Sequence, residues 1–277
     1  MSETSTTAVM RPPATRRGWT RARVLGAVWL AGWVALGASV VAMFVLGFDP
    51  DFFWRYGPRM LNGLLVTLQL VALAVALGAM LALPVAFARA SKNPLVGVAA
   101  YAYVYFFRGT PLLAQTFLVY YGAGQFRGLL ESAHLWWFFR DAFNCAVFTF
   151  TLNTAAYQAE IFRGAIDSVP RGQTEGGLAL GLSRWNIFRH IVAPQAMIIA
   201  LRPFGNEIIL MIKGSAIASV ITVFDLMGET RLAFSRSFDF QVYLWAALLY
   251  LSLVEIMRRV WDRIEARLTR HLKRDSD

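Results

Sequence analysis

Residues 169–194 read VPRGQTEGGLALGLSRWNIFRHIVAP and form the longest interruption of the apolar pattern in the second half of the chain. Pro170 can begin a helical turn because its missing N–H is not needed there, and Gly181 is suited to end that first helix. Ser183 is a suitable N-cap for a second helix, on which apolar residues recur at three- and four-residue spacing: Trp185, Phe188, Ile191 and Val192. The segment therefore predicts two short helices, the second basic and amphipathic, that bind either a membrane surface or a soluble partner.

The remainder of the chain is strongly apolar. Of its 277 residues, 57% are hydrophobic and 16% are charged, and several continuous apolar runs are long enough to cross a bilayer. Because these runs do not alternate apolar with polar residues, the sequence predicts an all-α membrane protein and argues against a β-barrel. The formal charge of +10 comes from Lys and Arg at the termini and in connecting loops, so topology explains it and no nucleic-acid partner is expected.

Six transmembrane helices are predicted, at about residues 24–46, 61–88, 95–121, 143–165, 195–223 and 241–258. Gly and Pro in the sequence FFRGTP, residues 106–111, predict a break or kink in the third span. The excess of Lys and Arg places both termini and segment 169–194 on the cytoplasmic side, with basic tails at 1–23, predicted to be disordered, and at 259–277. The predicted outer segments are 48–60, which is expected to lie at the interface, 122–142 and 225–240.

The N-terminal basic stretch and apolar run resemble a secretion signal only superficially. The run from Val24 to Leu46 is longer than a typical signal-peptide core and no small-x-small cleavage site follows, so an uncleaved span is predicted. Cys145 is the only cysteine, which excludes an intramolecular disulfide and a cysteine metal cluster.

No catalytic constellation or cofactor site is predicted. The three histidines fall in three separate segments, and the chain has no phosphate loop of the GxxxxGK[ST] type. The chain is therefore not expected to be an enzyme. If it moves a solute uphill, either an ion gradient drives the transport or another chain supplies an ATPase.

Charged residues inside predicted spans need an explanation because they are costly in a bilayer. They are Glu160, Arg163, Arg202, Glu207 and Lys213. Glu160 and Arg163 lie near the cytoplasmic end of their span, where snorkelling or pairing is a sufficient account. Glu207 and Lys213 are deeper and six residues apart, too far round a helix for a direct pair, so each either lines a pathway or pairs elsewhere.

Segment 169–194 resembles the cytoplasmic motif of ABC-importer permeases, which is EAA, three residues, Gly, nine residues, Ile, one residue and Leu-Pro. Glu175, Gly181, Ile191 and Pro194 occupy the Glu, Gly, Ile and Pro positions with the right spacing. Gly176 and Gly177 replace two alanines, and Ala193 replaces the leucine. Two glycines inside a helix cost roughly 1 kcal/mol each relative to alanine, which predicts a first helix that is frayed until its partner docks.

Three further stretches look like the polar amino-acid branch of that permease family: residues 106–122, 152–173 and 205–223. The resemblance covers about 60–258. Within the branch, FFRDAFNC at 138–145 and NEIILMIK at 206–213 are most similar to permease subunits for histidine, lysine, arginine and ornithine and to those for opines.

The resemblance implies a five-helix type I importer core at 60–258 in a bacterial inner membrane, preceded here by an additional span at 24–46. It also implies a second permease subunit, a pair of ABC ATPase subunits at the coupling loop, residues 169–194, and a periplasmic amino-acid-binding protein. Transport would follow alternating access. Glu175 would contact the ATPase cleft, while Trp185, Phe188 and Ile191 would give the loop an apolar grip on the ATPase or brace it against its own spans.

The substrate pathway is expected between the fourth and fifth spans, and its candidate residues are Glu160, Asn206, Glu207 and Lys213. The two carboxylates suit a cationic side chain, although pairing with Arg202 or Lys213 is an equally good role for them. Two other classes remain open. An ion-driven secondary transporter would use Glu160 and Glu207 but predicts inverted repeats, which we do not see. A non-transporting membrane scaffold would not depend on Glu175.

Overall fold

The computed structural model describes residues 20–270, which are helical apart from short connections. Most of the predicted N-terminal tail, residues 1–19, and the last seven residues of the predicted C-terminal tail lie outside the described residues. The chain divides into two units, residues 1–48 and 49–277. Each unit is described separately below.

The first unit contributes one helix, α1 (Arg21–Leu46), which covers the predicted first span. It is 26 residues long, and none of its residues is buried. At 1.5 Å per residue such a helix exceeds the hydrocarbon thickness of a bilayer.

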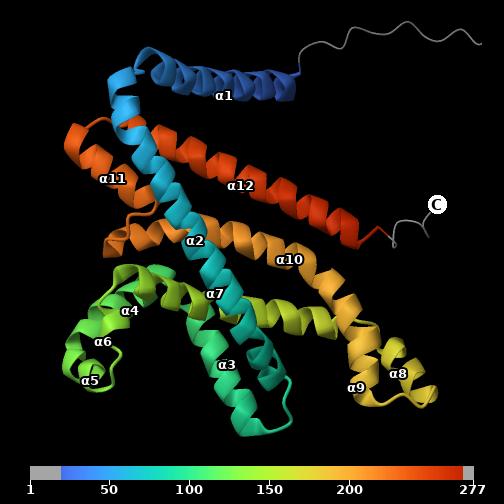
Figure 1. Cartoon of the computed structure of the whole chain (residues 1–277). Coiled ribbons are helices and arrows are strands. Elements are labelled where there is room, and N and C mark those ends of the chain that lie inside the picture. The colour runs from blue at the N-terminus through green and yellow to red at the C-terminus, as the bar shows by residue number, and fades with distance from the viewer. Residues whose placement is uncertain (1–19, 271–277) are drawn as a thin grey trace, which may run out of the picture. The chain divides into compact units, whose positions relative to one another are not determined.

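The second unit is a bundle of longer helices with short helices between them (Figure 1). Its α-helices are α2 (Pro50–Arg89), α3 (Pro94–Gly109), α4 (Leu112–Gln125), α5 (Arg127–Ser132), α6 (Trp136–Phe139), α7 (Ala142–Asp167), α8 (Arg171–Ala179), α9 (Arg184–Ile187), α10 (Ala193–Gly214), α11 (Leu226–Ser237) and α12 (Gln241–Leu268). A π-helical turn, η1 (Phe188–Val192), joins α9 to α10, and a 3₁₀ segment, η2 (Ser215–Ile221), follows α10.

Helix α2 begins earlier than the sequence predicted, because the expected interfacial segment 48–60 is helical from Pro50. Asp49 caps the helix, its carboxylate accepting hydrogen bonds from the N–H groups of Asp51 at 2.9 Å and Phe52 at 3.3 Å. Phe52 then packs on Trp245 of α12, with ring centroids 5.3 Å apart. The Asp49 cap and the aromatic packing therefore extend the helix through the segment that was expected to lie at the interface.

Helix α7 lies at the centre of the second unit and packs most extensively on α2, and also on α3, α4 and α10. Close packing on α2 depends on Gly78, where a Cβ would lie 2.5 Å from Thr154 Cγ2. The polar residues Asn153, Thr154 and Gln158 of α7 are buried among these helices and not exposed to lipid.

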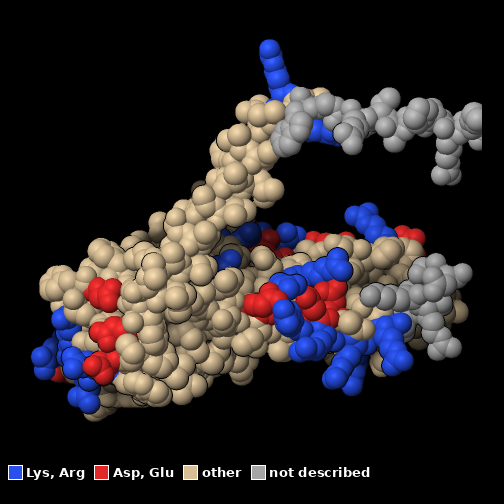
Figure 2. All heavy atoms as spheres, turned by 90° about the horizontal axis from the view of Figure 1, so that it is seen from above, with Lys and Arg blue, Asp and Glu red and all other residues tan. Residues whose placement is uncertain are grey.

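Four helical segments within residues 20–270 are long and apolar enough to cross a membrane: Arg21–Leu46, Pro50–Arg89, Arg184–Ile221 and Gln241–Leu268. Helix α7 is 26 residues long but carries its polar residues inward. The predicted third span is broken at Thr110 and Pro111, both extended, which confirms the predicted break. The structure thus shows an all-helical membrane protein, with charged patches separated by a broad uncharged surface on the second unit in Figure 2.

The predicted outer segment 225–240 contains a helix, α11, that hydropathy did not reveal. Asp225 caps it by accepting a hydrogen bond from the Gly228 N–H at 2.9 Å, and Leu226 is fully buried. Figure 1 shows α11 and the α5–α6 pair at one end of the second unit, with α8, α9 and the C-terminal end of α12 at the other. Segments expected on opposite sides of a membrane therefore lie at opposite ends of the bundle.

Candidate functional site

The coupling loop folds through local backbone preferences. Helix α8 begins after Pro170, and Gly181 ends the turn with a positive φ of 72°. Ser183 caps α9 by accepting a hydrogen bond from the Asn186 N–H at 3.2 Å. These three predictions are confirmed.

The two glycines of α8 have different surroundings. A Cβ at Gly176 would meet nothing within 4 Å, whereas a Cβ at Gly177 would lie 2.8 Å from Ile187 Cγ1. Gly177 is buried and Ile187 is 2% exposed, so α8 packs closely on α9 at this point. This corrects the expectation of a frayed helix: α8 is formed, and Gly177 permits its packing on α9.

The apolar residues of the coupling loop divide into an outward and an inward set. Trp185 of α9 is 64% exposed, and Glu175 of α8 is also exposed. Phe188 packs on Phe87 of α2 with ring centroids 5.7 Å apart, and Ile191 packs in a cluster with the end of α7. Trp185 is thus available to a partner, whereas Phe188 and Ile191 brace the loop against its own helices.

Three further exposed apolar residues of this loop were missed in the sequence: Leu178, Leu180 and Leu182. They do not follow a helical period, which is the pattern that identified the second helix. Their signal is instead a run of apolar residues within an otherwise polar segment, close to Glu175.

Pro194 explains the transition from the coupling loop to α10. Because proline has no N–H, it cannot donate to the carbonyl of His190, four residues earlier. The chain forms the wide π-helical turn Phe188–Val192 immediately before it and continues as α10. The loop and the span are therefore one continuous helical path.

Glu207 belongs to a polar network inside the bundle. Thr154 Oγ1 donates to Glu207 Oε1 at 2.9 Å, and Gln158 Nε2 donates to Thr154 Oγ1 at 3.0 Å and to the Val75 carbonyl at 3.3 Å. Glu207 is 6% exposed and makes no ion pair within the described part of the chain. Gln158 Oε1 is buried without a hydrogen-bond partner.

A second network, which sequence reasoning missed, stabilises the break between α3 and α4. Asn153 Nδ2 donates to the Phe107 carbonyl at 2.9 Å and to Gln115 Oε1 at 3.0 Å. Gln115 Nε2 donates to the same Phe107 carbonyl at 2.9 Å and to Thr110 Oγ1 at 2.7 Å. Side-chain amides thus donate hydrogen bonds to a backbone carbonyl at the break in the helix.

Glu160 is held by two guanidinium groups. Arg89 Nε donates to its Oε1 at 3.0 Å, and Arg163 donates to its Oε2 from Nε at 3.1 Å and from Nη2 at 2.9 Å. Arg163 Nη1 also donates to Asp167 Oδ2 at 2.7 Å. The cluster joins the C-terminal end of α2 to α7, just before the coupling loop.

The remaining candidate pathway residues lie on an exposed face of α10. Asn206 and Lys213 are exposed, seven residues or about two turns apart, together with Arg202. Arg202 Nε donates to Glu265 Oε1 of α12 at 2.6 Å beside a polar pocket of about 310 Å³. The structure therefore places Glu160 and Glu207 in two inner networks and Asn206 and Lys213 on a separate polar face.

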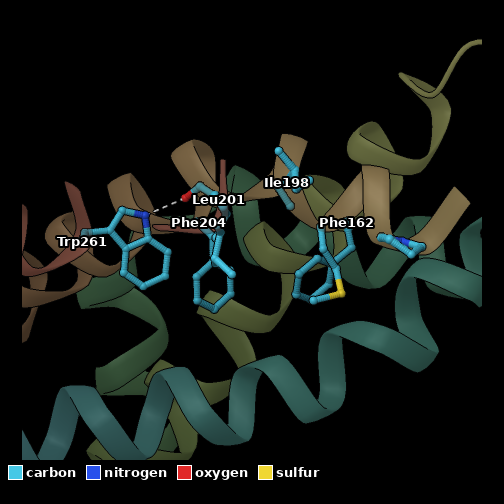
Figure 3. Close-up of a pocket in the computed structure, with 9 residues that line it drawn as sticks. Phe162, Ile198, Leu201, Phe204 and Trp261 are labelled. Atoms are coloured by element: carbon cyan, nitrogen blue, oxygen red, sulfur yellow. Dashed lines mark hydrogen bonds between the residues drawn. The ribbon is translucent and has the colours of Figure 1, made fainter. Parts of the chain in front are cut away.

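An apolar pocket of about 620 Å³ lies between α7, α10 and α12 (Figure 3). The Phe204 ring stacks between Phe162 and Trp261, with centroids 5.9 and 5.8 Å away, and Trp261 Nε1 donates to the Leu201 carbonyl at 2.8 Å. With almost only apolar groups on its wall, this pocket does not suit a polar solute.

Comparisons with known proteins identify relatives over most of the chain. The family described as binding-protein-dependent transport system inner membrane component matches residues 74–270. The nopaline transport system permease protein NocM of Agrobacterium fabrum is 41% identical over 78% of this chain and 90% of its own length. The histidine/lysine/arginine/ornithine transport system permease protein HisM of Escherichia coli K12 is 38% identical over 80% of this chain and 94% of its own.

Solved structures agree with these sequence relatives. A crystal structure described as an amino acid ABC transporter with histidines matches 79% of this chain and 99% of its own, with a TM-score of 0.72 and 32% identity. An inward-facing MetNI methionine ABC transporter matches 80% of this chain with a TM-score of 0.65 and 17% identity, which supports the fold alone. About a fifth of this chain lies outside these matches.

Proposed function

Because the chain belongs to the family of binding-protein-dependent transport system inner membrane components, we propose that it is the translocating subunit of an ATP-driven importer for a basic amino acid or an opine. The observation that carries this proposal is identity of about 40% to permeases of both substrate groups over nine-tenths of their length. ATP hydrolysis belongs to a partner subunit, since the chain has no phosphate-binding loop.

The proposed topology has six spans with both termini in the cytoplasm and α1 added to a five-helix core. The arrangement of the second unit supports it, because the coupling loop and the end of α12 lie opposite α11 and the α5–α6 pair. The excess of Lys and Arg in the predicted inner segments supports the same orientation.

The proposed partners are a pair of ABC ATPase subunits, a second permease subunit, a periplasmic binding protein and membrane lipid. The exposed surface of the coupling loop, with Glu175, Trp185 and the leucines at 178, 180 and 182, would contact the ATPase. The loop, with its turn at Gly181 and Pro194 at its end, would transmit ATPase movement to α10, because loop and span form one continuous helical path.

The exposed polar face of α10 supports the proposed pathway. Asn206 and Lys213 would be costly against lipid, so this face suits a water-filled pathway or the second permease subunit. Glu207 is the better candidate carboxylate for a cationic substrate, because Glu160 is already paired with Arg89 and Arg163. Substrate passing Glu207 would have to compete only with the neutral hydroxyl of Thr154.

Uptake by a reconstituted system tests the proposal. Proteoliposomes holding the chain, a second permease subunit and the ATPase would be supplied with binding protein and labelled arginine, lysine, histidine, ornithine, octopine or nopaline. We expect uptake of at least one of these solutes when ATP is present on the side of the membrane where the ATPase lies. Without ATP on that side we expect no uptake. Uptake by the chain alone under a proton or sodium gradient would contradict the proposal.

An ion-coupled secondary transporter is the second candidate function. Glu207 favours it, because this carboxylate is buried and makes no ion pair with the residues that the structure describes, and such carboxylates carry coupling ions in many transporters. Ionophores that collapse ion gradients separate the two candidates, because they abolish ion-driven uptake and leave ATP-driven uptake intact.

A further inference from the structure

The C-terminal end of α12 carries a basic patch that consists of Arg263, Arg267 and Arg270. Arg263 and Arg267 are one turn apart on the same side of the helix, and Arg270 follows two residues after its end. All three are exposed, and none makes an ion pair within residues 20–270. By contrast, Arg259 of the same helix pairs with Glu255 at 2.6 Å. The patch therefore keeps an uncompensated positive charge that attracts an anion.

The apolar pocket in Figure 3 ends next to this patch. Leu268, which follows Arg267 in the chain, lines the pocket together with Trp261, two turns earlier in α12. On α10 the lining runs from Pro194 to Phe204. The Phe204 and Trp261 rings stack with centroids 5.8 Å apart, so they mark the inner end of the pocket. Leu268 and Pro194 mark the other end, where α10 continues from the coupling loop.

The length and lining of the pocket match one leaflet of a bilayer. From Pro194 to Phe204 the helix rises about 15 Å, which is half of a hydrocarbon core about 30 Å thick. Met197 and Leu268 of the lining are 70% and 50% exposed, so the pocket is open at its side.

The volume of the pocket favours a chain thinner than a protein helix. A helix about 10 Å wide occupies roughly 1,200 Å³ over a length of about 15 Å. The pocket holds about 620 Å³ and has an almost entirely apolar wall. A single acyl chain fits this space better than a helix of a partner protein does.

We propose that the pocket holds an acyl chain of an anionic phospholipid and that the basic patch binds the phosphate of the same lipid. The lipid belongs to the leaflet on the side of the coupling loop. Basic groups beside membrane-spanning helices bind anionic headgroups in this way, and the planar fork of arginine donates two parallel hydrogen bonds to a phosphate. The bound lipid contacts α7, α10 and α12 together, because the lining of the pocket comes from these three helices. The inference goes beyond the proposed function and does not depend on transport.

Photo-crosslinking in vesicles tests the inference. The chain, assembled with its second permease subunit and the ATPase, would be reconstituted in phosphatidylcholine vesicles. These vesicles would contain a small fraction of phosphatidylglycerol with a diazirine near the end of one acyl chain. We expect labelling of the peptides that hold residues 197–204 and 261–268. It should be at least 10-fold stronger than with diazirine phosphatidylcholine at the same fraction, because each arginine near the surface contributes about 5-fold in affinity for an anionic lipid.

Two variants separate headgroup binding from acyl-chain binding. Combining Arg263→Gln, Arg267→Gln and Arg270→Gln should lower phosphatidylglycerol labelling of these peptides to the phosphatidylcholine level, because the phosphate loses its charged donors. Met197→Trp should lower labelling by both lipids, because the larger side chain fills the open side of the pocket. Met197 is 70% exposed, so this change disturbs little packing inside the bundle.

The matched control removes three exposed arginines from the opposite end of the second unit (Figure 1). It combines Arg127→Gln, Arg140→Gln and Arg236→Gln, and it should leave labelling of the two peptides unchanged. Equal labelling by the two lipids, or labelling that survives loss of the basic patch, would overturn the inference. Absence of label from both peptides in the assembled complex would also overturn it, since a second permease subunit would then cover the pocket.

Discussion

Glu160 Oε1 accepts a hydrogen bond from Arg89 Nε at 3.0 Å, and this ion pair joins the C-terminal part of α7 to the last residue of α2. The two side chains are 15% and 20% exposed, so water screens the pair only partly. Arg163 completes the cluster from the next turn of α7. The geometry is that of an interhelical clamp directly preceding the coupling loop.

Glu160→Gln should therefore lower stability more than it lowers substrate affinity. The change leaves two guanidinium groups without their carboxylate, and half-buried charged hydrogen bonds contribute about 1.5–3 kcal/mol each. Thermal unfolding of the purified protein in detergent should show a clear decrease in Tm. The control is Arg127→Gln, which removes an exposed pair with Glu131 and should change stability by about 0–1 kcal/mol. A Glu160→Gln protein with unchanged Tm but no substrate binding would assign Glu160 to the pathway instead.

The clamp also illustrates what the sequence alone could predict. The sequence shows that Glu160 is a charged residue inside a predicted span, where a charge is energetically unfavourable. Its partner Arg89 lies 71 residues away in the sequence and pairs with it only because α2 and α7 pack together. The coupling loop was predicted in more detail, since Pro170, Gly181 and Ser183 act on the backbone of their own turn. Helix ends and caps can be predicted from one sequence, because the residues that determine them are neighbours in the chain. The partners of buried polar groups cannot, because they depend on how the helices pack.

The same distinction explains the residues that were missed. Asn153 and Gln115 looked like isolated polar residues in apolar runs, and only the break between α3 and α4 gives them acceptors. Helix α11 lacks an apolar run because just one side of it is buried, and its Asp225 cap was not recognised. The count of six spans stays a prediction: four helical segments within residues 20–270 are long and apolar enough to cross a membrane, and α7, which covers the predicted fourth span, carries buried polar residues.

Gly176 and Gly177 should respond oppositely to alanine. Gly176→Ala meets no neighbour within 4 Å and should stabilise α8 by about 1 kcal/mol through helix propensity. Gly177→Ala places a methyl group 2.8 Å from Ile187 Cγ1 and should separate α8 from α9. Association with the ATPase, measured by co-purification, should persist in the first variant and decrease in the second. Equal behaviour of the two variants would show that α8 does not depend on close packing at Gly177.

Gly205→Ala should destabilise the packing of α10 on α12. A Cβ at this position would overlap the indole of Trp261, which must then move and give up its hydrogen bond to the Leu201 carbonyl. Overpacking of this kind typically costs about 1–3 kcal/mol. Gly214→Ala is the matched control in the same helix, since its nearest neighbour is 3.6 Å away.

A double variant separates this steric cause from other effects of the new methyl group. In a Trp261→Ala background, Gly205→Ala should lower the Tm no further, because the group it overlaps has been removed. An unchanged additional decrease in that background would rule out the indole as the source of the strain.

Glu175→Arg should abolish ATPase association while the protein remains in the membrane. Glu175 is exposed on α8, so reversing its charge disturbs no contact inside the bundle. At an interface, a reversed charge that meets a complementary partner typically costs about 2–5 kcal/mol, which corresponds to at least a 30-fold loss of affinity. Co-purification with the ATPase and ATP-driven uptake should both fail, whereas the amount of membrane-inserted protein should match wild type. Glu131→Arg, on the exposed helix α5 at the opposite end of the bundle, should alter none of the three quantities. Normal uptake with Glu175→Arg would contradict the proposed docking site and favour a membrane scaffold, because a scaffold has no need of a charged contact that transmits ATP-driven movement to α10.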